Sequence, residues 1–168
     1  MADPPERFAI IDYTFDTDPI ELQTQTGTDK NDDLFGTGRD RLLGQGGDDL
    51  LFATGGRDYL EGGGGNDLLY GNYGIDDRDE DHFVFGRDDG IDAIFDFVPP
   101  SQIAYAIDPP FEQDKIVLLG GTPKDITEVV KGAVASPDGD VELHYGDTTI
   151  RVEGVAGKDV AEDWFLIQ

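Results

Sequence analysis

The chain has 168 residues, with 12 Lys and Arg against 37 Asp and Glu, which gives a formal net charge of −25. This charge argues against binding to nucleic acid or to an anionic membrane surface, because both are themselves negative. The 23 glycines argue against a helical bundle, and the absence of cysteine excludes disulfides, thiolate metal sites and a cysteine nucleophile.

Residues 1–26 contain one predicted strand, at residues 8–15, which ends before a turn around Pro19. We expect this segment to cap one end of a stacked β structure or to join a C-terminal sheet, because such an end exposes apolar edges. The segment lacks the basic and long apolar stretches of an ordinary secretory signal. No apolar run of the chain is long enough to span a bilayer.

Residues 27–85 contain a repeated pattern with a period of about nine residues. The blocks begin at Gly27, Gly36, Gly44, Ala53, Gly62 and Gly71, and the second block is one residue short. The sixth position is always aspartate: Asp32, Asp40, Asp49, Asp58, Asp67 and Asp76. The eighth position is leucine in the first five blocks: Leu34, Leu42, Leu51, Leu60 and Leu69. We expect Phe83 to take this place in the sixth block.

The repeat has a direct physical interpretation. Glycines permit tight turns in which backbone carbonyls approach an ion closely, and aspartate adds the anionic oxygen that Ca²⁺ prefers. The last three positions predict a short strand whose middle side chain points inward, since strand side chains alternate. One block cannot bury a core alone, whereas stacked blocks can.

The pattern G-G-x-G-x-D-x-U-x, in which U is a large apolar residue, resembles the nonapeptide of the RTX, or haemolysin-type calcium-binding, family. This resemblance implies an all-β fold, a calcium-binding parallel β-roll in which two blocks form one coil. Facing turns then belong to blocks n and n+2. The implied ions lie between Asp32 and Asp49, Asp49 and Asp67, Asp40 and Asp58, and Asp58 and Asp76.

The resemblance also implies several Ca²⁺ ions, held by aspartate side chains and turn carbonyls. The predicted ligands in the repeats are Gly27, Asp29, Asp32, Gly36, Gly38, Asp40, Gly44, Gly46, Asp49, Ala53, Gly55, Asp58, Gly62, Gly64, Asp67, Gly71, Tyr73 and Asp76. Three residues depart from the pattern: Lys30 stands at a glycine position, and Arg39 and Arg57 stand at position five, where Asn or Asp is usual. We therefore expect the best site between Asp49 and Asp67.

Residues 86–168 resemble the region that follows the repeats in serralysin-type RTX proteins. The similar stretches are DGIDAIFDF, from Asp89, and DKIVL, from Asp114, and they flank an insertion at residues 98–113. Asp92 and Asp96 are candidates for an extra calcium site, the alternative being a solvated strand face. Residues 141–145 and 148–152 predict a hairpin over Gly146 and Asp147. We expect an antiparallel, β-sandwich-like cap with a C-terminal type I secretion signal.

The sequence has no H-E-x-x-H or G-x-S-x-G motif, so we do not expect an enzyme. We predict a calcium-binding module that folds outside a bacterial cell and supports type I secretion, with calcium ions and the type I secretion machinery as partners. The alternative is calcium-dependent binding of an extracellular polysaccharide. An exposed aromatic strip would favour it, with Tyr59, Tyr70 and Tyr73 as candidates.

Overall fold

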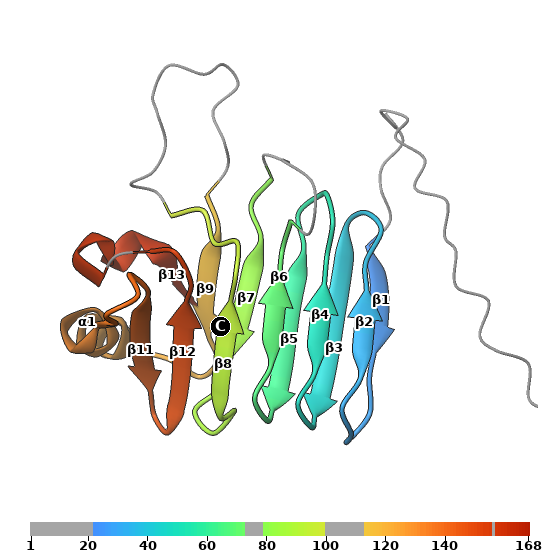
Figure 1. Ribbon diagram of the computed structural model, residues 1–168, viewed down its shortest axis with the longest axis horizontal. Helices are drawn as coiled ribbons and strands as arrows, with labels where there is room; N and C mark the ends of the chain where they lie inside the picture. The colour runs from blue at the N-terminus through green and yellow to red at the C-terminus, as the bar shows by residue number, and fades with distance from the viewer. Residues whose placement is uncertain (1–21, 73–78, 100–112, 156) are drawn as a thin grey trace, which may run out of the picture.

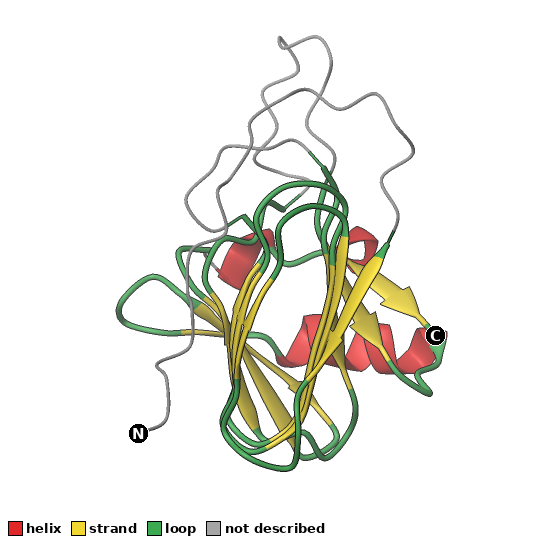
Figure 2. Ribbon diagram, turned by 90° about the vertical axis from the view of Figure 1, so that its right-hand side faces the viewer, coloured by secondary structure: helices red, strands yellow, loops and turns green. Residues whose placement is uncertain are grey.

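The computed structural model describes residues 22–72, 79–99, 113–155 and 157–168. The strand predicted at residues 8–15 and most of the insertion at 98–113 therefore lie outside the described residues. Two sheets face each other as layers; the first nine strands alternate between them, and the next three all lie in one sheet (Figures 1 and 2). The parallel β-roll that the sequence predicts is confirmed.

The six-stranded sheet is parallel throughout. Its strands, in spatial order, are β1 (Gln23–Thr26), β3 (Asp40–Gly46), β5 (Tyr59–Gly64), β7 (His82–Phe85), β9 (Lys115–Leu118) and β13 (Phe165–Ile167). Leu42 of β3 lies opposite Leu60 of β5, which in turn lies opposite Phe83 of β7. Phe83 thus takes the inward position that the sequence predicts for it.

The seven-stranded sheet is parallel from β2 to β12 and antiparallel from β12 to β10. Its strands, in spatial order, are β2 (Asp33–Phe35), β4 (Leu50–Phe52), β6 (Leu68–Tyr70), β8 (Ile91–Ile94), β12 (Thr148–Val152), β11 (Val141–Tyr145) and β10 (Val134–Ala135). The predicted hairpin is confirmed as β11 and β12.

The core is a double row of apolar side chains between the sheets. Leu42, Leu51, Leu60 and Leu69 are fully buried, and Ile94 and Ile116 continue the two rows beyond the repeats. Each such side chain contributes about 1.5–3 kcal/mol through burial. The period-nine leucines therefore stack only when consecutive coils are in register.

The chain crosses between the sheets at two edges. We call the connections after β1, β3, β5 and β7 the first edge, at the bottom of Figure 1, and those after β2, β4, β6 and β8 the second edge, at the top. The first edge has short turns of similar length. The second edge has longer connections toward the C-terminus, and residues 73–78 and 100–112 of these lie outside the described residues.

The C-terminal region extends both sheets of the roll. β12 pairs with β8, and β13 pairs with β9, so neither sheet is interrupted after residue 85. Helix α1 (Pro123–Gly132) was not anticipated from the sequence. Its start is fixed by a capping box in which Thr122 and Asp125 bond reciprocally, a signal that was present in the sequence. Two short 3-10 helices, η2 (Gly157–Asp159) and η3 (Glu162–Trp164), complete the region.

Candidate metal centre

A ladder of aspartates runs along the first edge. The backbone N–H of Asp32 donates to Oδ1 of Asp49 at 2.7 Å, and the N–H of Asp49 donates to Oδ1 of Asp67 at 2.8 Å. The N–H of Asp67 donates to Oδ1 of Asp92 at 2.9 Å. Each carboxylate is therefore held over the coil before it by a main-chain donor, and its position follows from the sheet register.

A second ladder runs along the second edge. The N–H of Asp40 donates to Oδ1 of Asp58 at 2.7 Å, and the N–H of Asp58 donates to Oδ1 of Asp81 at 2.9 Å. The N–H of Asp81 donates to Oδ1 of Asp114 at 3.0 Å. Asp81 thus stands above Asp58, at the place where the nine-residue spacing predicts Asp76. Asp76 and Tyr73 lie outside the described residues.

Sequence reasoning did not include Asp81 and Asp114 among the candidate ligands, although a signal for both was present. Each stands two residues before a buried apolar residue, Phe83 and Ile116 respectively, as in the regular blocks. Asp114 differs from the other ladder residues, because its Oδ2 also accepts a hydrogen bond from the N–H of Val98 at 2.7 Å. This geometry suits a residue that closes the ladder.

The ladder carboxylates are buried. Asp49, Asp67 and Asp92 are at most 2% exposed. Their Oδ2 atoms, and Oδ1 of Asp40, are buried and find no hydrogen-bond donor within the described part of the chain. An unpaired buried carboxylate oxygen is costly unless a cation or a proton neutralises it. The first edge therefore requires positive charge that these contacts do not supply.

Burial raises the pKa of these groups. Desolvation is the largest cause for Asp67, whose pKa rises to about 7, and for Asp92, whose pKa rises to about 8. Each ladder hydrogen bond lowers the pKa, and the charge of the neighbouring ladder aspartate raises it again. The pKa of Asp49 is raised for the same reasons. A site in which like charges are stacked and desolvated favours a bound cation.

The first glycine of a block lets the carboxylate pack directly against the backbone. A Cβ added to Gly44 would overlap both Oδ2 of Asp49 and the carbonyl oxygen of Gly62. A Cβ added to Gly27 would lie 2.6 Å from the carbonyl oxygen of Gly44 and 3.0 Å from Oδ2 of Asp32. Carboxylate and carbonyl oxygens of successive coils are therefore crowded together at these glycines. Such a set of hard oxygen donors is of the kind that Ca²⁺ prefers.

Side chains alone do not form a metal cluster: within the described ranges, no three His, Cys, Asp or Glu residues are grouped around one point. This agrees with a ligand set in which one or two carboxylates are completed by turn carbonyls. The Gly-rich turns 44–49 and 62–67 have carbonyls next to the ladder that could complete such a set. A second row also runs along the first edge, in which Asn31, Asp48 and Asn66 each accept a backbone N–H from the next coil, at 3.0, 2.9 and 3.2 Å.

The second edge is less regular. Arg39 and Arg57 occupy the position that Asn31, Asp48 and Asn66 occupy on the first edge. Ala53 is buried and carries a methyl group at the block position where Gly44 and Gly62 let a carboxylate pack against the backbone. The first edge, and the turns around Asp49 and Asp67 in particular, therefore offers the better cation site.

Asp96 has contacts unlike those of Asp92. Its Oδ1 accepts the N–H of Gly71 at 2.9 Å, and its Oδ2 accepts the N–H of Asn72 at 2.8 Å. Both oxygens thus hold the start of the sixth block. Of the two aspartates singled out after the repeats, the structure brings only Asp92 into the ladder.

Comparisons with known proteins agree with this geometry. A model of the RTX calcium-binding nonapeptide repeat, in four copies, matches residues 26–59 and 43–77. Among solved structures, the extracellular lipase LipA from Serratia marcescens is similar, with a TM-score of 0.60 and 25% sequence identity over 86% of this chain. The chain spans 21% of the lipase chain. No curated protein matches the sequence, and no helix among the described residues is long and apolar enough to cross a membrane.

Proposed function

We propose that the chain, whose residues 26–77 match the model of the RTX calcium-binding nonapeptide repeat, is a calcium-dependent folding module of a secreted bacterial protein. The observation that carries the proposal is the first-edge ladder, in which buried carboxylate oxygens of Asp49 and Asp67 face glycine turns without a neutralising partner among the described residues. Bound Ca²⁺ would supply that charge.

The residues of the ladder have two roles in this proposal. Each Oδ1 fixes the register between coils through a main-chain hydrogen bond, and each Oδ2 offers an anionic ligand. In a chain of net charge −25, the ladders repel one another when no cation is present. Folding and ion binding then form one equilibrium, because the coil that buries Leu51 and Leu69 is also the coil that assembles the ligands.

We place this role outside the cell. Extracellular calcium modules bind with dissociation constants of about 10⁻⁴–10⁻³ M, so such a chain stays unfolded where calcium is scarce and folds where it is abundant. The similarity to an extracellular lipase and the lack of cysteine accord with export as an unfolded chain. We therefore propose the type I secretion machinery as the partner of the unfolded chain. The role proposed is in folding and stability, not in catalysis.

The aromatic residues do not favour polysaccharide binding. Four rings form a stack on the seven-stranded sheet, with centroid separations of 5.2 Å for Phe35–Phe52, 4.8 Å for Phe52–Tyr70 and 4.6 Å for Tyr70–Phe95. The inner faces of the stack are therefore covered by neighbouring rings, and only Phe35 and Phe95, at its two ends, are well exposed, at 45% and 38%. Tyr59 lies on the other sheet, where Arg41 covers its ring at 4.8 Å. The stack serves instead to bind coil to coil.

A calcium titration followed by far-UV circular dichroism tests the proposal. In excess chelator the chain should lack most of its β signal, and millimolar calcium should restore it in one cooperative transition. Magnesium should substitute poorly, because it dehydrates reluctantly and demands a small octahedral site. An unchanged β spectrum in chelator would contradict the proposal.

A further inference from the structure

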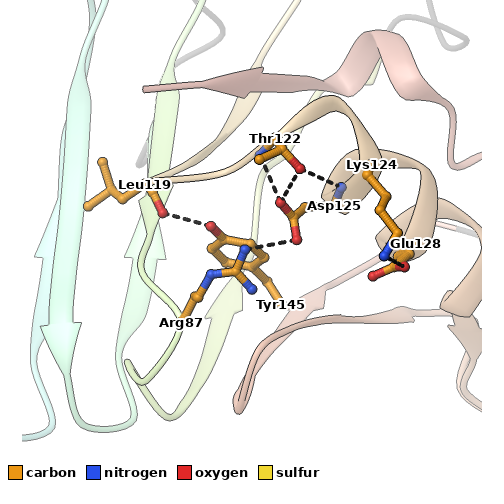
Figure 3. A network of polar contacts seen from close by, with 7 residues as sticks. All are labelled: Arg87, Leu119, Thr122, Lys124, Asp125, Glu128 and Tyr145. Atoms are coloured by element: carbon orange, nitrogen blue, oxygen red, sulfur yellow. Dashed lines mark hydrogen bonds and ion pairs between the residues drawn. The ribbon is translucent and has the colours of Figure 1, made fainter.

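Arg87 lies in the last turn of the first edge and reaches the C-terminal region with its side chain (Figure 3). Its Nη2 bonds Oδ1 of Asp125, in the first turn of α1, at 2.8 Å. Its guanidinium lies 4.4 Å from the ring centroid of Tyr145, at the end of β11. The Tyr145 hydroxyl donates to the carbonyl oxygen of Leu119 at 2.7 Å, so the aromatic ring that Arg87 covers is itself fixed.

The backbone around Arg87 contacts the C-terminal region as well. The N–H of Asp147 donates to the carbonyl oxygen of Arg87 at 2.8 Å, at the tip of the β11–β12 hairpin. A Cβ on the adjacent Gly146 would lie 2.7 Å from that carbonyl oxygen, which together with a φ of +66° requires glycine at this point. Thr148 joins the same turn, since its Oγ1 accepts the N–H of Asp89 at 2.8 Å and donates to the carbonyl of Gly86 at 3.0 Å.

On its other side, the turn that contains Arg87 contacts the aspartate ladder of the first edge. The N–H of Gly65 donates to the carbonyl oxygen of Asp89 at 2.7 Å, and Gly65 and Gly90 form a parallel bridge. Asp92, two residues after Gly90, accepts a hydrogen bond from the N–H of Asp67. Residues 86–92 therefore lie between the glycine turn 62–67 and the hairpin and helix of the C-terminal region.

We propose that Arg87 couples calcium binding at the last turn of the first edge to docking of the C-terminal region. Arg87 is a positioning residue: it holds α1 and β11 against a turn whose conformation is set by Asp92 and Asp89. Ion binding that orders this turn then favours docking, and docking favours ion binding by the same factor, because coupling between two sites is reciprocal. The inference rests on the calcium-dependent folding proposed above.

The chain contains both the reporter and the control for a test. Trp164 is the only tryptophan, is fully buried against Phe97 in the C-terminal region, and follows docking by fluorescence. Hydrogen–deuterium exchange of peptides within residues 40–70 follows the repeats. The matched control is Arg151, which pairs with Glu142 at 3.0 Å on the exposed face of the hairpin and has a similar side-chain exposure, 49% against 46% for Arg87.

In the full-length wild-type chain and in Arg151→Gln, the two signals should share one calcium midpoint. In Arg87→Gln, the Trp164 midpoint should rise by about twofold while the repeat peptides move less, because an exposed ion pair and one cation–π contact are lost. Arg87→Lys keeps the charge but loses the planar guanidinium, so its Trp164 midpoint should lie between those of the wild-type chain and Arg87→Gln. Coincident midpoints in Arg87→Gln, equal to those of Arg151→Gln, would overturn the coupling. A wild-type chain without any calcium response would overturn the proposed function instead.

If Arg87→Gln did not fold even at saturating calcium, Arg87→Lys would decide the matter. A Trp164 midpoint in Arg87→Lys that exceeds the repeat midpoint supports the coupling. Equal Trp164 and repeat midpoints in Arg87→Lys would contradict the coupling.

Discussion

The backbone N–H of Asp67 and the carboxylate of Asp92 form a hydrogen bond of 2.9 Å across 25 residues of sequence. Asp67 ends the glycine turn of the fifth block, whereas Asp92 lies beyond the residues that match the repeat model. The same bond joins neighbouring coils throughout the first edge. The aspartate ladder therefore continues one coil past the recognisable repeats, and ends where Ile150 of β12 aligns with Asp92.

Loss of a ladder carboxylate should weaken calcium-dependent folding. Asp67→Asn keeps the shape of the side chain but removes its charge, so we expect a calcium midpoint about two- to threefold higher, since about 2 kcal/mol of charged interaction is shared among several ions. Asp49→Asn should behave alike. Asp138→Asn, in an exposed turn, is the control and should leave the midpoint unchanged. Equal midpoints for all three variants, measured by far-UV circular dichroism, would contradict the assigned register.

Substitution of the first glycine of a block should be as damaging as loss of the carboxylate. Gly44→Ala places a methyl group against Oδ2 of Asp49 and the carbonyl of Gly62, and should cost about 1–3 kcal/mol of unfolding free energy in saturating calcium. Gly64→Ala is the matched control, because a Cβ there meets no atom within 4 Å. Urea denaturation measures both. If Gly64→Ala were as damaging as Gly44→Ala, general glycine loss rather than displacement of the Asp49 carboxylate and the Gly62 carbonyl would explain the effect.

Without calcium, acid should partly replace the missing cation. The folded pKa values of Asp67 and Asp92, about 7 and about 8, lie above the unfolded value of about 3.9, so the folded chain binds more protons. This contribution to stability is complete below about pH 4 and is lost as the pH rises through 7 to 8. In excess chelator, the β signal should therefore be stronger at pH 5 than at pH 8.

The double variant Asp67→Asn/Asp92→Asn is the control for this pH dependence, since neither amide titrates. It should show a smaller difference between pH 5 and pH 8 than the wild-type chain. A chelated wild-type chain that gains β structure as the pH rises would show that these groups are not buried carboxylates in the folded state.

The regular blocks could be predicted because one residue pattern encodes both the turn and the buried face of the strand that follows it. Aspartate at position six and leucine at position eight fix the turn, the strand and the inward face together, and the structure places Asp49 and Leu51 accordingly. Asp81 was harder to assign, because an acidic run precedes it and spacing alone offered Asp76 first. Its place follows from Phe83, whose burial sets the register.

The C-terminal region was less predictable because long-range contacts define it. The pairing of β12 with β8 and of β13 with β9 joins segments that no local pattern connects. The Arg87–Asp125 pair spans 38 residues and leaves no periodic signal in the sequence. Asp96 resembles a ligand by its spacing, yet its two oxygens hold backbone N–H groups of the sixth block.

Removal of the C-terminal region should prevent folding of the repeats. A chain ending at Phe85 lacks β8 and β9, which pair with β6 and β7, and exposes Leu69 and Phe83 to water. Fragment 1–85 should therefore stay without β structure at calcium concentrations that fold residues 1–168, as circular dichroism would show. An equal calcium midpoint for the fragment and the full chain would mean that the region after residue 85 is not a cap.

Binding of cations along the first-edge ladder is tested most directly by a crystal structure of the full chain grown in calcium, with anomalous diffraction data collected at long wavelength. We expect anomalous peaks at the turns around Asp49 and Asp67, next to the carbonyl oxygens of Gly44 and Gly62. Replacing Asp67 by Asn should remove or weaken the peaks there. A folded, calcium-soaked chain whose ladder carboxylates contact only backbone N–H groups, with no anomalous peak along the first edge, would contradict it.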